Sequence, residues 1–359
     1  MATRVMIMAG GTGGHVFPAL AVARELRSRG CQISWLGSPA SFESRLVPDQ
    51  GIAFDAIDSF RLRGQGLASL VLAPFRLLRA LVQAGRVLRS RRPQVVLGLG
   101  GFASGPGGLM SRALGFPLVI HEQNTIPGLT NRWLAKVANR VLQAFPGSFS
   151  GAVGAVTCGN PVRPEILELS PPEERFARRG GSPMKLVVMG GSLGAQALNE
   201  NLPRALALID DASRPEVLHQ AGRGKAETTR EVYAQSGVAA EVVEFVDDIP
   251  AVLADADLLV CRAGALTISE LAAAGVGSIL VPFPHAVDDH QTRNAAYLCE
   301  AGAALLLPQS ELTPEVLARL LGDLAADRER LLKMASAARG QAMPGALACV
   351  ADACMEVAA

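Results

Sequence analysis

The fold is decided by the segment VMIMAGGTGGH, residues 5–15, together with its counterpart LVVMGGSLGA, residues 186–195. In both segments a short, continuously apolar run leads into a cluster of glycines, which is typical of a strand buried on both faces. Glycine permits a tight turn and a close approach of the backbone to a ligand. A helix that begins after each turn presents its free N–H groups and its positive dipole end to that ligand. Two such loops, half a chain apart, predict paired α/β domains with anion-binding loops.

The composition fits two cytosolic domains. A chain of 359 residues is long enough for two complete cores, and hydrophobic residues make up 49% of it. The six cysteines form no Cys-x-x-Cys pair, which favours free thiols in a reducing compartment over a disulfide framework or a zinc site. The first apolar run lies too close to the start of the chain for a signal peptide, and no run approaches the length of a membrane-spanning helix.

The net charge of +1 conceals an asymmetry between the two halves. Residues 1–160 carry 17 Lys and Arg against 6 Asp and Glu, whereas residues 161–359 carry 17 against 27. Nine arginines and no acidic residue lie between Asp58 and Glu122. The basic half is expected to meet something anionic, although attraction between the two halves is an equally simple explanation.

Strands and helices alternate along the chain, which predicts parallel sheets with right-handed crossovers. A proline-rich hinge at Gly159–Pro164 separates a domain at 1–160 from a second at 161–340, and 170–183 is interpreted as a further connector. The segment after Pro314 is expected to be helical to the end, with a break near Pro344. The expected strands are Val5–Ala9, Gln32–Leu36, Val95–Leu99, Pro117–His121, Arg140–Gln143, Leu186–Met189, Glu216–His219, Val242–Phe245, Leu258–Cys261, Ser278–Val281 and Ala304–Leu307.

The glycine loops are candidate sites for phosphate or sugar hydroxyls, because ligands of open parallel sheets bind at the carboxyl ends of the strands. Thr12, Gly13 and Gly14 lie there, as does Ser192; the alternative is that the glycines serve only the turns. Neither loop is a P-loop, because no Gly-Lys-Ser/Thr follows. A third loop, Gly98–Ala103, comes closest to the dinucleotide fingerprint, so a dinucleotide site remains an alternative.

The segment CRAGALTISE, residues 261–270, is another strand, turn and helix. Glu270 is expected in the first helical turn, where its carboxylate can accept two hydrogen bonds from a vicinal diol such as that of a ribose. On spacing alone, a capping box formed by Thr267 and Glu270 is at least as good an interpretation.

Histidine titrates near neutral pH, so His15, directly after the first glycine loop, is a candidate general base. A structural donor is the alternative for this side chain. No histidine and carboxylate cluster has the spacing of a metal site, and none is expected.

Residues 67–92 form a basic amphipathic stretch that suits an anionic membrane surface. A core-facing helix with a solvated arginine side is an equal alternative. Nucleic acid is not expected, because aromatic residues do not interleave with the charges. The candidate membrane face consists of Leu70, Val71, Phe75, Leu78, Val82, Arg76, Arg79, Arg86 and Arg89.

Six segments, in order, resemble the bacterial N-acetylglucosaminyltransferases that complete the lipid-linked peptidoglycan precursor. The resemblance covers the chain from the first strand to about residue 300. It rests on Ala9–Pro18, Gly100–Gly108, His121–Asn124, Gly159–Arg163, Gly190–Ala195 and Cys261–Glu270.

The resemblance implies two Rossmann-like domains facing across a cleft, the GT-B type of glycosyltransferase fold, with a final helix at about 341–359 that returns to the first domain. It implies an inverting transfer of GlcNAc from UDP-GlcNAc to the 4-hydroxyl of MurNAc in undecaprenyl-pyrophosphoryl-MurNAc-pentapeptide. The first domain would bind the acceptor and the membrane, and the second would bind UDP-GlcNAc. No cofactor or metal is implied; helix N-termini and Arg163 would hold the pyrophosphate. The protein would be peripheral, on the cytoplasmic face of the inner membrane, with other cell-wall synthesis proteins as further partners.

Several residue roles follow from the resemblance. Ser192 would hold phosphate, the backbone of Val246 would read uracil, and Glu270 would bind the ribose. Gln291 and Asn124 would contact the GlcNAc hydroxyls. The segment at the diphosphate consists of Ala265, Leu266, Thr267, Ile268 and Ser269.

On the acceptor side the resemblance places Thr12, Gly13 and Gly14, with His15 as the first candidate base and Glu122 as the second. His290 and Phe102 depart from the family pattern, where a glutamine and a tyrosine are frequent.

Two other activities are compatible with the same residues. A UDP-GlcNAc 2-epimerase would keep the fold and need no lipid acceptor, and a nicotinamide-dependent dehydrogenase would use the loop at Gly98–Ala103.

Overall fold

The computed structural model describes residues 2–58 and 67–359, with the backbone alone at 67–72 and 287. The described chain divides into two compact units. Unit 1 consists of Met1–Val162 and Met343–Ala359, and unit 2 of Arg163–Ala342. The last helix therefore packs with the first part of the chain rather than with the segment that precedes it.

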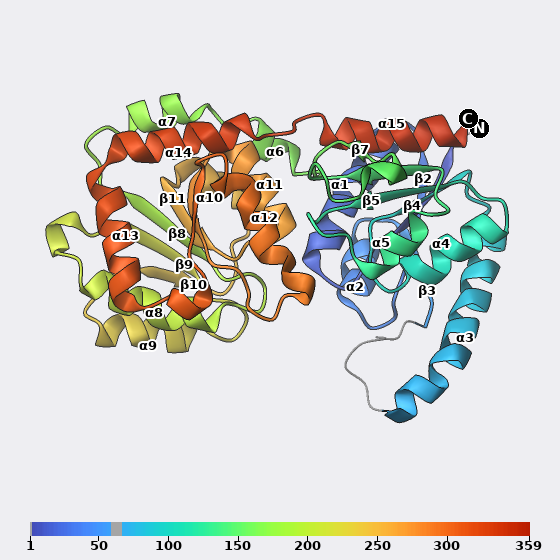
Figure 1. Cartoon of the computed structure of the whole chain (residues 1–359), viewed down its shortest axis with the longest axis horizontal. Helices are drawn as coiled ribbons and strands as arrows, with labels where there is room; N and C mark the ends of the chain where they lie inside the picture. Colours follow the sequence, from blue (N-terminus) through green and yellow to red (C-terminus); the bar gives the residue numbers. More distant parts are fainter. Residues whose placement is uncertain (1, 59–66) are drawn as a thin grey trace. The chain divides into compact units, whose positions relative to one another are not determined.

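Unit 1 contains a seven-stranded parallel sheet in the order β3-β2-β1-β4-β5-β6-β7 (Figure 1). The central strand, β1, is hydrogen-bonded to β2 on one side and to β4 on the other. The strands are β1 (Arg4–Met8), β2 (Gln32–Gly37), β3 (Ala53–Ala56), β4 (Val95–Gly98), β5 (Leu118–Glu122), β6 (Arg140–Gln143) and β7 (Val156–Thr157).

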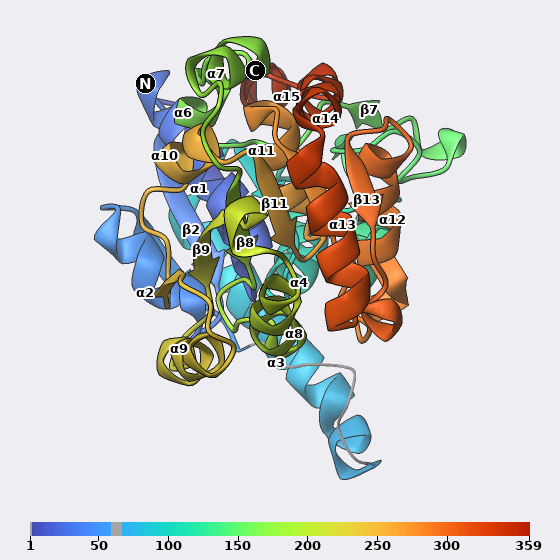
Figure 2. The same cartoon turned by 90° about the vertical axis from the view of Figure 1, so that its left-hand side faces the viewer.

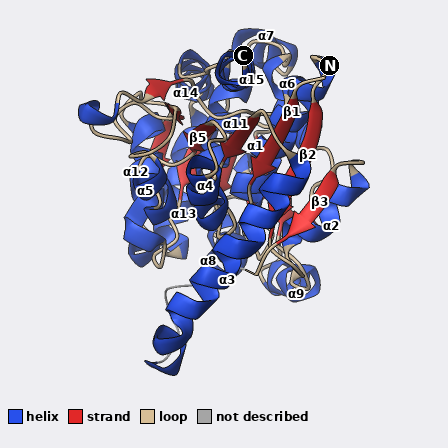
Figure 3. Cartoon of the chain, turned by 90° about the vertical axis from the view of Figure 1, so that its right-hand side faces the viewer, coloured by secondary structure: helices blue, strands red, loops and turns tan. Residues whose placement is uncertain are grey.

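Helices cover both faces of this sheet because successive side chains of a strand point to opposite sides. Val5 and Ile7 pack with α1, α2 and α15, while Met6 and Met8 pack with α3, α4 and α5. Figure 3 shows α3 running past α4 as a long helix. The helices are α1 (Gly13–Ser28), α2 (Phe42–Asp49), α3 (Leu67–Arg91), α4 (Ser104–Ala113), α5 (Leu129–Leu134), the short 3-10 helix η1 (Gly151–Val153) and α15 (Ala346–Ala358).

Unit 2 contains a six-stranded parallel sheet in the order β10-β9-β8-β11-β12-β13. Figure 2 shows its strands behind α8 and α13. The strands are β8 (Lys185–Met189), β9 (Glu216–Gln220), β10 (Glu241–Val243), β11 (Leu258–Cys261), β12 (Gly277–Leu280) and β13 (Ala304–Leu306). The helices are α6 (Pro164–Leu167), α7 (Pro172–Arg178), α8 (Gln196–Ala207), η2 (Asp211–Ser213), α9 (Ala226–Gln235), α10 (Ile249–Asp255), α11 (Ala265–Ala274), η3 (Val287–Asp289), α12 (His290–Cys299), η4 (Gln309–Glu311), α13 (Pro314–Ala326) and α14 (Arg328–Gly340).

In each sheet the direction of strand succession reverses at one point, and the glycine loops lie there. The reversal falls between β1 and β4 in unit 1 and between β8 and β11 in unit 2. Ligands of doubly wound sheets bind at such points, beyond the carboxyl ends of the strands. The predicted architecture of two Rossmann-like α/β domains is thereby confirmed.

The structure corrects three expectations. The sequence does not predict the edge strands β3 and β7, because both are short and their residues are exposed or half-buried, so neither shows a continuous apolar run. The presumed connector at 170–183 contains α7, in which Pro172 occupies the first helical turn, where a missing N–H costs nothing. The C-terminal helical region has a second break at Asp327, whose carboxylate accepts a hydrogen bond from the Arg330 N–H at 2.9 Å and caps α14.

Candidate active site

A pocket of about 650 Å³ lies at the carboxyl edge of the unit 2 sheet. The loops that follow β8, β11 and β12 line it, together with residues from the loop after β9 and from α12. Its lining residues are Met189, Gly190, Gly191, Ser192, Leu193, Gly194, Ala195, Gln196, Ala197, Lys225, Arg262, Gly264, Thr267, Phe283, Pro284, His285, Gln291 and Gln309. Three of the expected donor-site residues, Ser192, Thr267 and Gln291, are thus brought together in one cavity.

The second glycine loop is held in place by the end of β9 and by the loop that follows it. Gln220 accepts a hydrogen bond from the Gly191 N–H at 3.1 Å and donates one to the Gly191 carbonyl at 3.0 Å. A Cβ atom on Gly194 would lie 2.0 Å from the Ala221 carbonyl oxygen, and Gly194 has φ +70°. Glycine at this position therefore permits both the turn and the contact between the two loops.

Replacing Gly194 with alanine is expected to destabilise unit 2 by about 2 kcal/mol or more, because a non-glycine residue would be strained there and would clash with backbone. The measurement is the thermal unfolding midpoint. Gly322→Ala is the matched control, because Gly322 lies within α13 with open space around its Cβ position, and this change is expected to leave the midpoint equal or higher. An unchanged midpoint for Gly194→Ala would contradict the packing described here.

The pocket is electropositive in a manner that suits a diphosphate. The N-termini of α8 and α11 open toward it, and Lys225 and Arg262 contribute to its lining. Arg262 also supports the pocket wall, since it donates to the carbonyls of Val281 and Pro282, both at 3.1 Å, and to Gln309 Oε1 at 2.6 Å. Burial lowers the pKa of Arg262 from its usual value.

Glu270 lies three residues after Thr267 on α11 and is not among the residues that line the pocket, but its pKa departs from the ordinary value more than that of any other carboxyl group near this edge. Its side chain is 12% exposed, and within the described residues Oε1 has no hydrogen-bond partner. Arg163 Nε lies 4.0 Å from Oε1 and offsets part of the cost of burial. Burial nevertheless raises the pKa of Glu270 to about 7. A buried carboxylate with an unsatisfied oxygen is suited to accept hydrogen bonds from a ligand.

The capping-box interpretation of Thr267 and Glu270 is wrong. Helix α11 begins at Ala265 after an N-cap at Gly264, so Glu270 lies in the second helical turn and not in the first. Ile268 is fully buried and its N–H donates to the Gly264 carbonyl at 2.9 Å, so it supports the helix rather than offering a group to a ligand. Ala265, Leu266 and Ser269 occupy the same two turns of α11 and do not line the pocket.

Gln291, rather than His290, lies at the pocket. Its Oε1 accepts a hydrogen bond from the Phe283 N–H at 2.8 Å, which links α12 to the loop after β12. Asp288 and Asp289 take positive φ angles just before α12 begins. Val246 follows β10 and is not among the residues that line the pocket.

In unit 1 the first glycine loop leads directly into α1, with Thr12 as the N-cap. The carbonyl of Thr12 accepts the first hydrogen bond of the helix, from the His15 N–H at 3.1 Å. The His15 ring binds the Gly10 carbonyl through Nδ1 at 3.1 Å. Because a carbonyl can only accept, Nδ1 carries a proton, and in the neutral ring Nε2 then presents a lone pair. A Cβ atom on Gly100 would lie 3.2 Å from Nε2, so the third glycine loop leaves room for the ring.

Glu122 organises the loop after β5. Its Oε1 accepts from the backbone and side-chain nitrogens of Asn124, at 2.9 and 3.2 Å, and its Oε2 from the Gly128 N–H and the Asn131 side chain, at 3.1 and 2.9 Å. Four donors therefore occupy both oxygens. This arrangement favours a structural role over that of a base.

The candidate membrane face belongs to α3. Ala80, Ala84 and Leu88 of this helix are fully buried against unit 1, yet Phe75 and Leu78 are 71% and 59% exposed. Val82, Arg76, Arg79, Arg86 and Arg89 are exposed as well, and Arg79 pairs with Asp58 at 2.6 Å. The side chains of Leu70 and Val71 lie outside the described residues. No helix in the described part of the chain is long and apolar enough to cross a bilayer.

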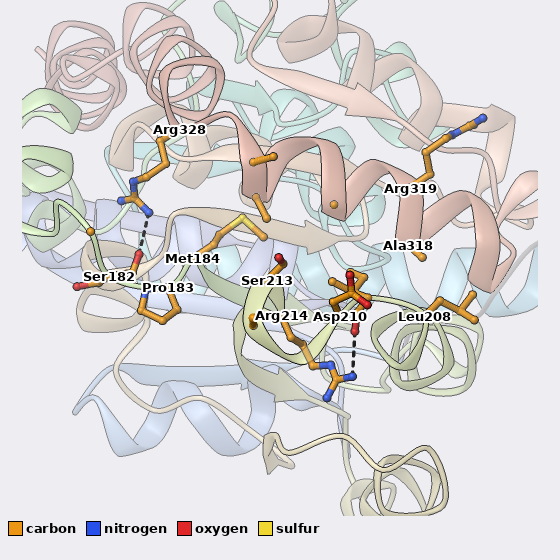
Figure 4. A pocket seen from close by; sticks show the side chains of 16 residues that line it. Ser182, Pro183, Met184, Leu208, Asp210, Ser213, Arg214, Ala318, Arg319 and Arg328 are labelled. Atoms are coloured by element: carbon orange, nitrogen blue, oxygen red, sulfur yellow. Dashed lines mark hydrogen bonds between the residues drawn. The ribbon is translucent and has the colours of Figure 1, made fainter.

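A second pocket of about 630 Å³ lies where β8 and β9 begin, at the opposite edge of the same sheet. Figure 4 shows Arg328 directed to the Ser182 carbonyl, a hydrogen bond of 3.3 Å. Arg214 donates to the Ile209 carbonyl at 2.9 Å. These arginines satisfy backbone groups, and the amino edge is not where parallel sheets bind ligands. The candidate active site is therefore assigned to the carboxyl edges.

Among the described residues no cluster of histidine, cysteine or carboxyl groups could hold a metal ion.

Comparison with known proteins places the chain in a family. The N-terminal domain of glycosyltransferase family 28 matches residues 5–143, and its C-terminal domain matches residues 185–348. The UDP-N-acetylglucosamine–N-acetylmuramyl-(pentapeptide) pyrophosphoryl-undecaprenol N-acetylglucosamine transferase of Marinobacter nauticus is 53% identical over 99% of this chain and 98% of its own. The protein of the same name from Chromohalobacter salexigens is 54% identical over 99% and 97%.

A solved structure agrees with these relatives. The crystal structure of MurG from Acinetobacter baumannii superposes with a TM-score of 0.86 at 42% identity and covers 99% of both chains. The expected GT-B type fold is thus confirmed. The chain belongs to glycosyltransferase family 28, and it is an N-acetylglucosamine transferase.

Proposed function

We propose that this protein transfers GlcNAc from UDP-GlcNAc to the 4-hydroxyl of MurNAc in undecaprenyl-pyrophosphoryl-MurNAc-pentapeptide, with inversion at the sugar C1. The observation that carries the proposal is the pocket at the strand-reversal point of unit 2, where two helix N-termini and Lys225 meet beside the glycine loop. That chemistry suits the diphosphate of a nucleotide sugar.

The donor roles follow from the groups that each residue presents. Ser192 and the N-terminus of α8 bind one phosphate, and Thr267 at the start of α11 binds the other. Glu270 accepts hydrogen bonds from the ribose diol, and Arg163 keeps its carboxylate ionised when the donor is bound. Gln291 and Asn124 bind hydroxyls of GlcNAc, and the backbone of Val246 binds uracil.

The acceptor roles belong to unit 1. Thr12, Gly13 and Gly14 bind the acceptor pyrophosphate at the N-terminus of α1. His15 Nε2 takes the proton of the MurNAc 4-hydroxyl while the oxygen of that hydroxyl attacks C1 of GlcNAc. The bond between C1 and the diphosphate oxygen breaks in the same step, and UDP leaves with the bonding electrons. A single displacement of this kind inverts the configuration at C1.

Release of UDP measured with and without the lipid-linked muramoyl acceptor tests this function. We expect rapid release only when both UDP-GlcNAc and the acceptor are present. Equal release without acceptor would favour a UDP-GlcNAc 2-epimerase, and no turnover of UDP-GlcNAc under either condition would refute the proposal.

We also propose that the α3 face attaches the protein to the cytoplasmic surface of the inner membrane. Phe75, Leu78 and Val82 recur at helical spacing with exposed side chains, and exposed arginines flank them. The inward face of the same helix is already packed through Ala80, Ala84 and Leu88. An amphipathic helix packs one apolar face against the core of its domain. A second apolar face on the same helix therefore indicates contact with another apolar environment.

The double variant Phe75→Ser/Leu78→Ser is expected to bind vesicles containing anionic lipid at least about tenfold more weakly, because each side chain contributes about 1.5–3 kcal/mol when buried. Co-sedimentation with vesicles measures this. Leu208→Ser is the matched control, because Leu208 is an equally exposed leucine in unit 2, at 59%. An equal loss of vesicle binding in the double variant and in Leu208→Ser, or no loss in either variant, would contradict a specific role of α3.

A further inference from the structure

Glu43 is a buried carboxyl group that the proposed chemistry has not used. It lies in the first turn of α2 and is fully buried. Its Oε2 accepts a hydrogen bond from the Gly11 N–H at 3.1 Å, and its Oε1 accepts one from the Ser38 N–H at 3.2 Å. In the described part of the chain no lysine or arginine pairs with it. Both partners are donors, which is the arrangement for an ionised carboxylate, and an unpaired buried charge of this kind is costly to keep.

The peptide group between Gly10 and Gly11 connects this carboxylate to His15. Its N–H donates to Glu43, and its C=O accepts from His15 Nδ1 at 3.1 Å. Neighbouring groups hold the peptide from two sides. A Cβ atom on Gly10 would lie 2.3 Å from Glu43 Oε1, and one on Gly101 would lie 2.5 Å from the Gly10 oxygen. The carboxylate and the imidazole therefore bind opposite ends of one clamped peptide.

The second glycine loop shows that the turn itself does not need a charge. Gly191 corresponds to Gly11, and the two have similar φ angles of +82° and +92°. The Gly191 N–H donates to the neutral amide of Gln220 at 3.1 Å. Four residues after these glycines stand His15, in the first turn of α1, and Ala195, the N-cap of α8, which has no ring to orient. The loop with the histidine has the carboxylate, and the loop without the histidine has an amide.

We propose that Glu43 is a positioning residue that fixes the tautomer and orientation of His15 through the Gly10–Gly11 peptide. A negative charge at the N–H end polarises the peptide and makes its carbonyl a stronger acceptor. The stronger carbonyl keeps the proton on Nδ1 and leaves the Nε2 lone pair for the acceptor hydroxyl. When Nε2 takes that proton, the imidazolium that forms is stabilised by the same polarised carbonyl. This proposal rests on the proposed role of His15 as the base.

The test compares Glu43→Gln with the wild-type full-length protein. Glutamine retains the size and one acceptor oxygen but removes the charge. We expect kcat to fall at least about tenfold, because part of the benefit of a well-positioned base is lost, while KM for UDP-GlcNAc stays within about twofold. The ¹⁵N NMR signals of the His15 ring, assigned with His15→Ala, report its tautomer. They should indicate the Nδ1-protonated tautomer in the wild-type protein and a mixture of tautomers in Glu43→Gln. Glu43→Asp, which keeps the charge, should recover part of kcat.

The control for a general effect of losing a buried carboxylate is Asp257→Asn. Asp257 is 2% exposed, accepts from the Lys185 N–H at 2.8 Å and pairs with Arg179 at 3.0 Å, all at the other edge of the unit 2 sheet. The Asp257→Asn substitution is expected to lower the thermal unfolding midpoint, while the folded variant retains the kcat of the wild-type protein.

The double variant His15→Ala/Glu43→Gln separates the possible failures. If Glu43 acts through His15, Glu43→Gln costs nothing further in the His15→Ala background. An equal loss of kcat in both backgrounds, or an unchanged tautomer in Glu43→Gln, would overturn the proposal and leave Glu43 as a support for the loop. If His15→Ala turns over normally while Glu43→Gln still alters the tautomer, the base assignment fails and the hydrogen-bonded chain stands.

Discussion

Replacing His15 with alanine is expected to lower kcat by about 10²–10⁴-fold, which is the usual contribution of general acid–base catalysis. The acceptor hydroxyl is a weak nucleophile until its proton is removed as the new bond forms. Nε2 of His15 is suited to that task, because Nδ1 is committed to the Gly10 carbonyl at 3.1 Å. Steady-state turnover with saturating UDP-GlcNAc and lipid-linked acceptor measures the effect.

Donor binding separates a catalytic from a structural role of His15. The pocket that we assign to the donor is built from residues of unit 2 alone. His15→Ala should therefore leave the Kd for UDP-GlcNAc within about twofold of the wild-type value. A loss that is confined to kcat indicates that an interaction made only in the transition state has been removed. Turnover close to wild type would show that His15 serves only to hold the Gly10 carbonyl.

Replacing Glu270 with alanine is expected to weaken UDP-GlcNAc binding at least about 100-fold, because two hydrogen bonds to a charged acceptor are lost, each contributing about 1.5–3 kcal/mol. The position is suited to a large effect, since Oε1 is buried and has no partner among the described residues. Isothermal titration with UDP-GlcNAc measures the Kd. Glu173→Ala, an exposed glutamate of α7 in the same unit, is the control and should leave the Kd unchanged. An unchanged Kd for Glu270→Ala would refute the ribose assignment.

The raised pKa of Glu270, about 7, gives this prediction a pH dependence with a definite sign. In the free protein the carboxyl is largely protonated below that pH, whereas a diol that donates two hydrogen bonds favours the ionised form. Donor affinity should therefore weaken as the pH falls below 7, and binding at pH 6 should release a proton. Titrations in two buffers of different ionisation enthalpy detect that proton, and Glu270→Gln should abolish its release.

The same group affects the stability of the free protein. In the folded protein the pKa of Glu270 lies above its ordinary value near 4.5. The contribution of Glu270 to the free energy of unfolding is therefore fully present below pH 4.5 and is lost as the pH rises through about 7. Bound donor should reverse this trend, because it supplies the hydrogen bonds that an ionised carboxylate needs.

The elements predicted from sequence were those whose signals are local. The strands before both glycine loops are buried on both faces, so their apolar runs are continuous and visible. The sequence predicts a connector where α7 lies, because two prolines and several charges conceal the buried Phe176 and Arg175. The start of α11 was placed wrongly for a related reason: Gly264 has no side chain that signals a cap, so Thr267 seemed the better candidate.

The candidate site was only partly visible in the sequence. His15 and the glycines lie within one segment, so the spacing along the chain was enough to group them. Glu43, Gln220 and Arg262 were missed, although each organises a loop, because their partners lie 32, 29 and 19 or more positions away. Glu122 was visible but its hydrogen bonds were not, since its donors come from the loop after β5 and from Asn131 of α5.

By itself, the sequence determined the two α/β units, the strand-to-helix turns and the family, because apolar runs and glycine turns depend on nearest neighbours along the chain. The tertiary structure alone decided which buried polar groups have partners. It gave the first glycine loop a carboxylate and the second an amide, and it left Glu270 Oε1 unsatisfied beside Arg163. The physical reason is that a buried polar group is satisfied by whatever packing brings within about 3 Å, and packing joins segments that are far apart in sequence.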